Sequence, residues 1–281
     1  MAADIRQILV HLDPTRSAAR RLGAACELAK RLQASLTALY AATPGFAEQP
    51  YAPAIGGPGM SAALLELDDR RREQAQKVFD ETRRASGLDV AWAQTSQVPI
   101  TDAFAQQALF ADLLVLGQRD PLDDDAAAVP ADFVESVLLA CGRPAVVVPH
   151  IGATASIGNT LAIAWKETPE AARAVTAALP FLCKAKRVHV LGWGEEPAPG
   201  VGGQALDLAK YLGSHGIAFT WDRAGAEPQK IGELLLSRAF ELGADLLVMG
   251  CYGHSRAREW ILGGASRTIL QSMTLPVLMM H

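Results

Sequence analysis

The chain has 281 residues, of which 50% are hydrophobic and 20% charged, and its formal net charge is -4 at pH 7. The length exceeds the roughly 100–150 residues of a typical domain, and the composition can bury a large core, which excludes a disordered protein. The negative charge gives no electrostatic basis for binding nucleic acid or an anionic membrane, and no apolar run approaches the ~18 residues that span a bilayer. Because Met1 leads almost directly into a strand without a signal peptide, we expect a cytoplasmic location.

Short apolar runs alternate with helix-period segments along the first half of the chain. Strands are predicted near residues 7–13, 35–41, 89–95, 113–117 and 145–149, and helices near 17–32, 62–85, 100–109 and 131–140. Residues 43–61, after the second strand, are rich in Pro, Gly and Ala. This composition predicts a surface loop rather than a lid over a ligand.

The second half repeats this order. Strands are predicted near residues 160–165, 187–192, 218–223, 246–250 and 277–280, and helices near 169–182, 203–214, 228–242 and 265–272. Residues 150–158 are small and polar enough to link two domains, which we place at 1–150 and 159–281.

Sequence identity between the two halves supports an internal repeat. Asp-Leu-Leu-Val-Leu-Gly at 112–117 returns as Asp-Leu-Leu-Val-Met-Gly at 245–250, an offset of 133 residues, whereas the first strands match at an offset of 153. The first copy therefore holds about 20 extra residues, for which 43–61 is the natural place. Alternating strands and helices predict an α/β fold, with two tandem doubly wound, five-stranded parallel sheets of Rossmann-like type.

Three glycines follow the fourth strand of the second copy. Gly250, Gly253 and Gly263 are separated by two and nine residues, and Gly264 then opens a helix. Glycines allow close approach of a ligand to backbone N–H groups, and the first turn of a helix carries unpaired N–H donors and partial positive charge. The stretch therefore predicts a phosphate cradle, although the chain contains no Gly-Lys-Ser or Gly-Lys-Thr of a Walker loop.

This glycine spacing, with the closing strand Leu275 to Met280, resembles the C-terminal half of a universal stress protein (UspA-like) domain. The repeat extends the resemblance over nearly the whole chain as a tandem pair. It implies an adenine nucleotide alpha hydrolase-like fold, a regulatory role in the stress response, and a bound adenine nucleotide, ATP or else ADP or AMP. The implied site comprises Lys166, Met249, Gly250, Gly253, His254, Gly263, Gly264, Ala265 and Ser266, with Arg256 as another phosphate neighbour.

The two copies depart from the family pattern in opposite ways. The family places an acidic residue near the nucleotide base, and the first copy has Asp13 there, but it lacks the second glycine and carries Asp132 where the second copy has Gly264. A carboxylate at a helix N-terminus repels phosphate. The second copy keeps its glycines but has Lys166 at the acidic position, and Gly264 removes a hydroxyl for which Ser266 could substitute. We therefore expect nucleotide binding in the second copy only.

Other functions find weaker support. Gly200 to Ala205 fits G-x-G-x-x-A, but seven residues separate it from the preceding strand, which argues against NAD binding. No nucleophile and base are paired, so we expect no catalytic residues and at most a weak ATPase. The cysteines form no Cys-x-x-Cys pair, and a metal shared by His150 and His281 is an alternative hypothesis only. If neither copy holds a nucleotide, the chain would be an interaction or small-ligand-binding module.

The resemblance also bears on assembly. In related proteins the fifth strands of two domains pair edge to edge, which covers exposed hydrogen-bonding groups. Here the two copies could pair within one chain as a pseudo-dimer, and the sequence leaves open whether two chains then form a homodimer.

Overall fold

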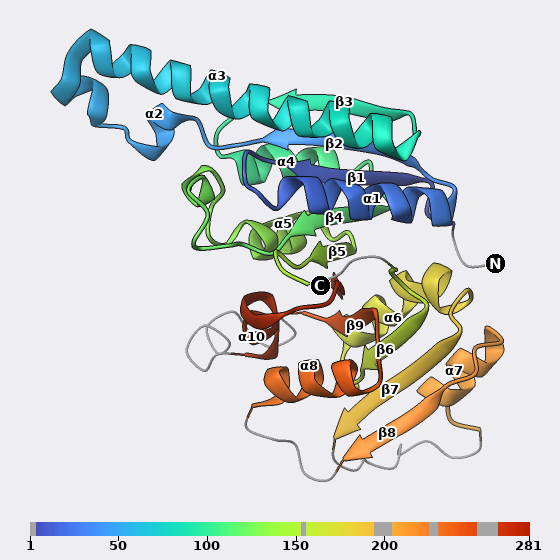
Figure 1. The fold of residues 1–281 in the computed structure, drawn as a ribbon. Helices are drawn as coiled ribbons and strands as arrows, with labels where there is room; N and C mark the ends of the chain where they lie inside the picture. The colour runs from blue at the N-terminus through green and yellow to red at the C-terminus, as the bar shows by residue number, and fades with distance from the viewer. Residues whose placement is uncertain (1–3, 153–155, 194–203, 225–229, 252–263) are drawn as a thin grey trace. The chain divides into compact units, whose positions relative to one another are not determined.

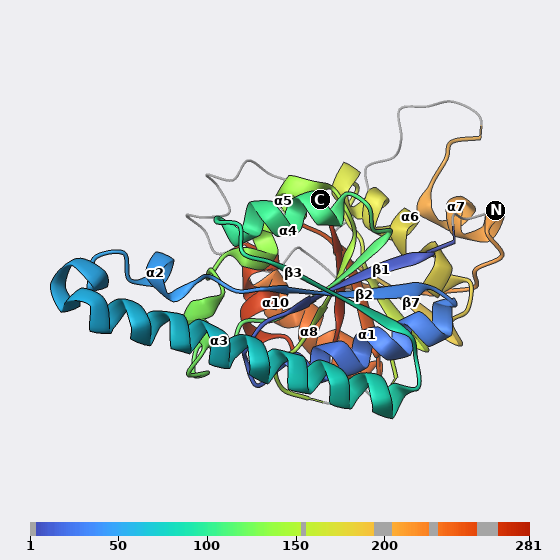
Figure 2. The ribbon, with the colours of Figure 1, turned by 90° about the horizontal axis from the view of Figure 1, so that it is seen from above.

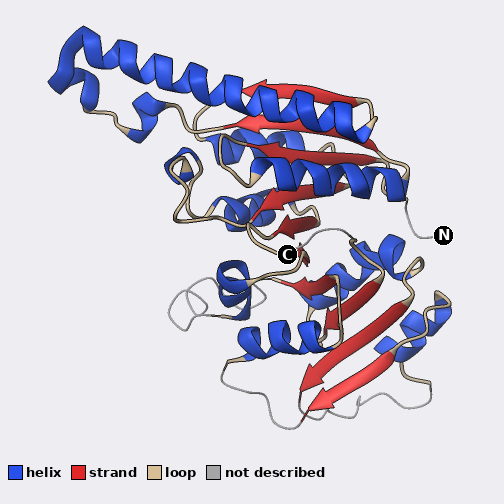
Figure 3. Cartoon of the chain, viewed as in Figure 1, coloured by secondary structure: helices blue, strands red, loops and turns tan. Residues whose placement is uncertain are grey.

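A computed structural model describes residues 4–152, 156–193, 204–224, 230–251 and 264–281 (Figure 1). The chain divides into two compact units, one covering Ile5–Ile151 and the other running from Gly152 to His281. Each unit has a central sheet with helices on both faces, as Figure 3 shows by its colours. Within the described ranges, no helix combines the length and hydropathy that crossing a bilayer requires.

The first unit has a parallel five-stranded sheet in the order β3-β2-β1-β4-β5. In Figure 2, α1 and α3 cover one face of this sheet, and α4 and α5 cover the other. Its elements are β1 (Gln7–Leu12), α1 (Ala18–Leu32), β2 (Ser35–Ala41), α2 (Gly45–Glu48), α3 (Ala52–Ser86), β3 (Val90–Thr95), α4 (Ile100–Ala108), β4 (Leu113–Gly117), the 3-10 helix η1 (Ala126–Ala128), α5 (Phe133–Cys141) and β5 (Ala145–Val148).

The second unit has the corresponding sheet in the order β10-β9-β6-β7-β8, again with parallel neighbours. Helices α6 and α7 cover one face, and α8 and α10 cover the other (Figure 2). Its elements are β6 (Thr160–Ala164), α6 (Pro169–Leu182), β7 (Arg187–Trp193), α7 (Leu208–Ser214), β8 (Thr220–Ala224), α8 (Ile231–Glu241), β9 (Leu246–Gly250), α10 (Ala265–Ser272) and β10 (Val277–Met280).

The predicted α/β class, the parallel sheets and the two similar halves are confirmed. Strands β1, β4 and β5 in the first unit, and β6 and β9 in the second, are almost wholly buried because helices cover both of their faces. This burial explains why these strands read as continuous apolar runs in the sequence.

The predicted loop over residues 43–61 is wrong. It holds the short helix α2 and the first ten residues of α3, which is interrupted only at Gly57, where φ is +61° and ψ is -157°. Pro58 follows that break and begins the next helical segment. Its missing N–H is tolerated there, because the first N–H groups of a helix have no acceptor within the helix. One glycine with positive φ therefore accounts for the kink within α3, whereas Pro44 and Gln49, which flank α2, keep non-helical backbone angles.

The predicted start of α7 at residue 203 is also too early. The helix begins at Leu208 because the Asp207 carboxylate accepts a hydrogen bond from the Lys210 N–H at 2.7 Å and caps the first turn. Ala205, the last residue of the G-x-G-x-x-A match, thus lies before this cap instead of inside a helix start, whereas residues 194–203 lie outside the described ranges.

Candidate functional site

The carboxyl ends of β9, β6 and β7 place three residues side by side. Met249 pairs with Ala164, and Ala164 pairs with Leu191. The next residue on each strand therefore forms one row, Gly250, Trp165 and Gly192, and the Trp165 N–H donates to Leu191 O at 2.9 Å. In a doubly wound parallel sheet, ligands bind outside this edge.

Gly250 is required by the packing of α6. A Cβ at this position would lie 2.5 Å from both Glu170 C and Ala171 N, in the first turn of that helix. The turn is capped by Thr168, whose side-chain oxygen accepts from the Ala171 N–H at 3.3 Å. The glycine therefore allows a capped helix N-terminus to pack directly on the end of β9.

The N-terminus of α10 has the features of an anion site. Among the described residues, its N-cap Gly264 makes no side-chain capping bond, and its first turn contains no acidic residue. The turn is positioned by α8, since a Cβ on Gly232 would lie only 2.8 Å from Thr268 Cβ. Because α10 follows β9 and runs back along the sheet, its N-terminal end, which carries partial positive charge, faces the edge where that strand ends.

The structure brings part of the predicted site together. Met249 and Gly250 end β9, Met249 being 5% exposed; Lys166 is exposed and directly follows Trp165. Ser266 is buried at 3% exposure in the first turn of α10. The other described members are Gly264 and Ala265, while Gly253, His254, Arg256 and Gly263 lie outside the described residues.

In the first unit, the acidic residue at the end of β1 is already paired inside the protein. The Asp13 side chain is 3% exposed; its Oδ2 accepts from Arg21 Nη2 at 2.7 Å and its Oδ1 from the Thr15 N–H at 2.9 Å. Arg21 Nε also donates to His11 O at 2.6 Å. Both oxygens of Asp13 are thus engaged and unavailable to a nucleotide base.

Burial and the arginine set the charges in this cluster. Burial by itself raises the pKa of Asp13, but Arg21, His11 and Thr15 together outweigh burial and hold the pKa below its usual range. Burial lowers the pKa of His11 to about 4. The ring is therefore neutral near pH 7, with Nε2–H donating to Ala41 O at 2.8 Å. The 3.5 Å approach of His11 Nδ1 to Asp13 is accordingly not an ion pair at that pH.

The guanidinium of Arg21 also fills the space over the strand end. A Cβ on Gly117, the counterpart of Gly250, would lie 2.0 Å from Arg21 Nη1. In the second unit, the residue at the position of Arg21 is Ala174 by the offset of 153. The α5 N-terminus, moreover, carries Asp132 as N-cap and Glu135 in its first turn. In the first unit, Arg21 therefore occupies the space at the end of β4, and two carboxylates lie at the helix N-terminus that corresponds to a phosphate site.

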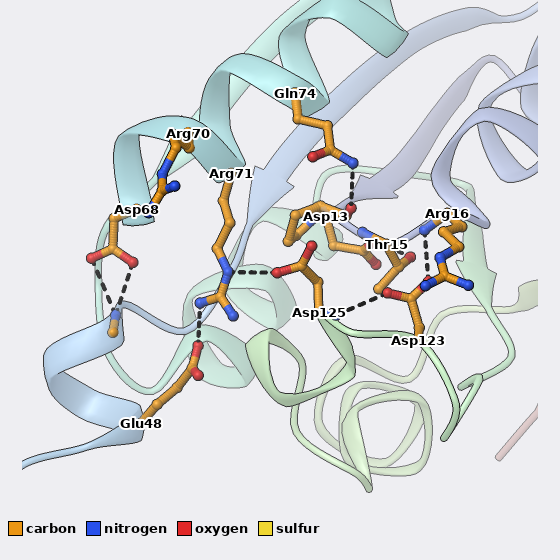
Figure 4. Close-up of polar contacts among 12 residues, drawn as sticks. Asp13, Thr15, Arg16, Glu48, Asp68, Arg70, Arg71, Gln74, Asp123 and Asp125 are labelled. Carbon is orange, nitrogen blue, oxygen red and sulfur yellow. Dashed lines mark hydrogen bonds and ion pairs between the residues drawn. The ribbon is translucent and has the colours of Figure 1, made fainter. Parts of the chain in front are cut away.

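Acidic residues of the loop after β4 are tied to cations and N–H groups of the same unit (Figure 4). Asp123 accepts from the Arg16 N–H at 2.8 Å. Arg71 donates to Asp125 at 2.8 Å and to Glu48 at 2.6 Å, with 7% of its side chain exposed. These contacts fix the loop and α2 against α3.

Sequence reasoning missed the role of Arg21. The available signal was its position on the buried face of α1, between the apolar Ala18, Leu22 and Ala25 at helical spacing, where an arginine needs a buried partner. The histidines of the metal hypothesis have other partners: His150 Nδ1 lies 2.9 Å from Gln118 Oε1, and His281 Nδ1 lies 3.1 Å from Cys251 O. No group of three or more His, Cys, Asp or Glu residues that could hold a metal ion occurs in the part of the chain that the structure describes.

Comparisons with known proteins agree with this architecture. Residues 225–281 match the model of the universal stress protein family. A universal stress protein from Archaeoglobus fulgidus DSM 4304 has 15% identity and a TM-score of 0.71, with 98% of this chain and 95% of that chain covered. A putative universal stress protein from Pseudomonas aeruginosa UCBPP-PA14 has 17% identity and a TM-score of 0.53, over 98% and 93%.

A universal stress protein solved in complex with cAMP is also similar, at 20% identity and a TM-score of 0.34, over 53% of this chain and 99% of that chain. The bound cAMP belongs to the structure of that protein. No curated protein sequence matches the chain.

Proposed function

The chain joins two domains of the universal stress protein fold, the second of which carries that family's sequence pattern, and we propose that this second unit binds an adenine nucleotide, ATP foremost, in a regulatory role. ADP and AMP are the other candidate ligands. The proposed site comprises the end of β9 and the start of α10, with the glycines, His254 and Lys166 predicted from the sequence.

The α10 N-terminus carries this proposal. Among the described residues, Gly264 provides no side-chain cap and no acidic residue lies in the first turn. The matching helix of the first unit begins instead with Asp132 and Glu135. The partial positive charge at a helix N-terminus favours phosphate, whereas the two carboxylates oppose it. The difference supports one nucleotide per chain.

The test is a titration of the whole chain with ATP, ADP and AMP by calorimetry, after mass spectrometry of any nucleotide that co-purifies. Gly264→Asp gives α10 the N-cap of α5, and the φ of -55° at Gly264 is open to any residue. The variant should fold, since Asp is a favoured N-cap. One carboxylate about 4 Å from a phosphate costs about 1–4 kcal/mol, so ATP affinity should fall roughly 5- to 1000-fold.

Asp132→Asn in the first unit is the matched control, and it should leave the ATP affinity of the chain unchanged. Gly253→Val, a second variant of the proposed site, should abolish ATP binding while the fold is kept. Equal affinity of the wild type and Gly264→Asp would contradict the proposed site. Absence of any nucleotide, bound or titrated, would leave the interaction module as the better function.

Exposed apolar residues favour that second candidate function. Phe46 in α2 is 54% exposed, and Tyr51 and Ile55, at the start of α3, are 77% and 86% exposed. Exposed apolar side chains of this size, gathered on one segment, are typical of surfaces that contact partners. Under this function, Tyr51→Ser and Ile55→Ser would weaken association in sedimentation experiments, whereas ATP would have no effect on it.

A further inference from the structure

Four buried side-chain atoms in the second unit, on Trp165, Glu170, His189 and Trp193, have no hydrogen-bond partner among the described residues. Two of them lie where β6 leads into α6: Trp165 Nε1, a donor, and Glu170 Oε2, an acceptor. A buried polar atom without a partner costs free energy, and in native proteins such an atom usually meets water or a ligand. The two atoms are therefore candidates for ligand recognition.

The two residues lie at the same corner of the sheet. Trp165 stands between Gly250 and Gly192 in the row of strand ends, and neighbouring strands are about 4.8 Å apart. Glu170 Cβ lies only 2.8 Å from the position that a Cβ on Gly250 would take. Glu170 thus sits over the strand next to Trp165, beside the proposed nucleotide site.

The carboxylate of Glu170 is half engaged. Its Oε1 accepts from Arg173 Nη2 at 3.0 Å, while 12% of the side chain is exposed. Only Oε2 therefore remains as a free acceptor. At the corresponding positions, 153 residues earlier, the first unit has Leu12 and Ser17. The unpartnered donor and acceptor are thus specific to the second unit, in which Lys166 replaces the strand-end acid.

We propose that Glu170 Oε2 and Trp165 Nε1–H recognise the base of the nucleotide as adenine. The carboxylate oxygen accepts a hydrogen bond from the 6-amino group, and the indole N–H donates to the neighbouring ring nitrogen. Guanine fits less well, because its N1–H and 2-amino group both need acceptors and Arg173 already engages Oε1. This assignment rests on nucleotide binding by the second unit.

Calorimetric titration of the full chain with ATP, GTP and purine riboside triphosphate, which lacks the 6-amino group, tests the assignment. The wild type should bind ATP about tenfold or more tightly than the other two, since a hydrogen bond to a charged group is lost. Glu170→Leu should bind ATP and purine riboside triphosphate equally. Trp165→Phe should weaken both about fivefold and leave their ratio unchanged, because both bases keep the ring nitrogen.

Glu167→Ala is the control, because its carboxylate is exposed just before the start of α6, and it should keep the wild-type ratio. Circular dichroism and melting temperature would establish that each variant is folded. If the wild type binds ATP but Glu170→Leu keeps the discrimination, water alone satisfies the two atoms and only this assignment is wrong. If the wild type binds none of the triphosphates, the proposed function is wrong and this assignment with it.

Discussion

Removing the cation of the buried Asp13–Arg21 pair should strongly destabilise the first unit. Arg21→Met keeps most of the side-chain volume but leaves Asp13, whose side chain is 3% exposed, with Thr15 as its remaining donor residue. Breaking a buried pair in this way typically costs 3–5 kcal/mol. Since the variant also frees His11 O, we expect a loss of about 4 kcal/mol at pH 7, a large part of a typical domain's stability.

The destabilisation caused by Arg21→Met should depend on pH in a predictable direction. In the wild type the pKa of Asp13 lies below its ordinary value, so the carboxylate contributes stability above about pH 4 that is lost as the pH falls. In Arg21→Met, burial is no longer offset and the pKa rises above its unfolded value. Ionised Asp13 then destabilises the variant, so the loss of unfolding free energy relative to the wild type should shrink as the pH falls from 7 towards 4.

Urea unfolding at pH 7 and pH 4.5, with hydrogen exchange in β1 and β4 reporting on the first unit, measures both effects. The double variant Asp13→Asn/Arg21→Met removes the charge together with its partner and should recover most of the loss. The reasoning is refuted if Arg21→Met costs less than about 1 kcal/mol, or if the double variant is no more stable than the single one.

Three other changes test the packing and the charges. Gly250→Ala should lower the free energy of unfolding by about 1–3 kcal/mol in thermal melts, because the new methyl group meets the backbone of α6. In the same melts Gly23→Ala should raise it by about 0.5–1 kcal/mol, because Gly23 lies in α1 with open space around it. Arg71→Ala leaves two carboxylates without their shared cation and should speed hydrogen exchange in α2; exposed Arg72→Ala should not. Burial lowers the pKa of His11 to about 4 in the folded protein, so the unfolded chain takes up the proton first as the pH falls below 6.5. The free energy of unfolding therefore falls by up to about 3 kcal/mol by pH 4. His11→Phe should flatten that slope in acid titrations of stability, and an unchanged slope would assign it to other groups.

Local patterns determined most of the secondary structure. Buried parallel strands must be apolar along their whole length, so β4 and β9 were predicted at their observed limits, 113–117 and 246–250. The repeat offsets likewise located the two similar halves. Composition failed over residues 43–61, because Gly and Pro indicate a loop while, within α3, only Gly57 adopts a backbone that a helix excludes.

By itself, the sequence determined the tandem α/β architecture, the glycine-bearing strand end and the asymmetry between Asp132 and Gly264. Only the tertiary structure decided which side chains meet there. Asp13 and Arg21 are eight residues apart yet come from different elements, and Trp165 and Glu170 gather beside Gly250 through strand register and helix packing. Register and close packing depend on contacts between residues distant in the chain. A local sequence pattern therefore does not predict that Arg21 occupies the strand end of the first unit, or that Trp165 and Glu170 keep an unpaired donor and acceptor in the second.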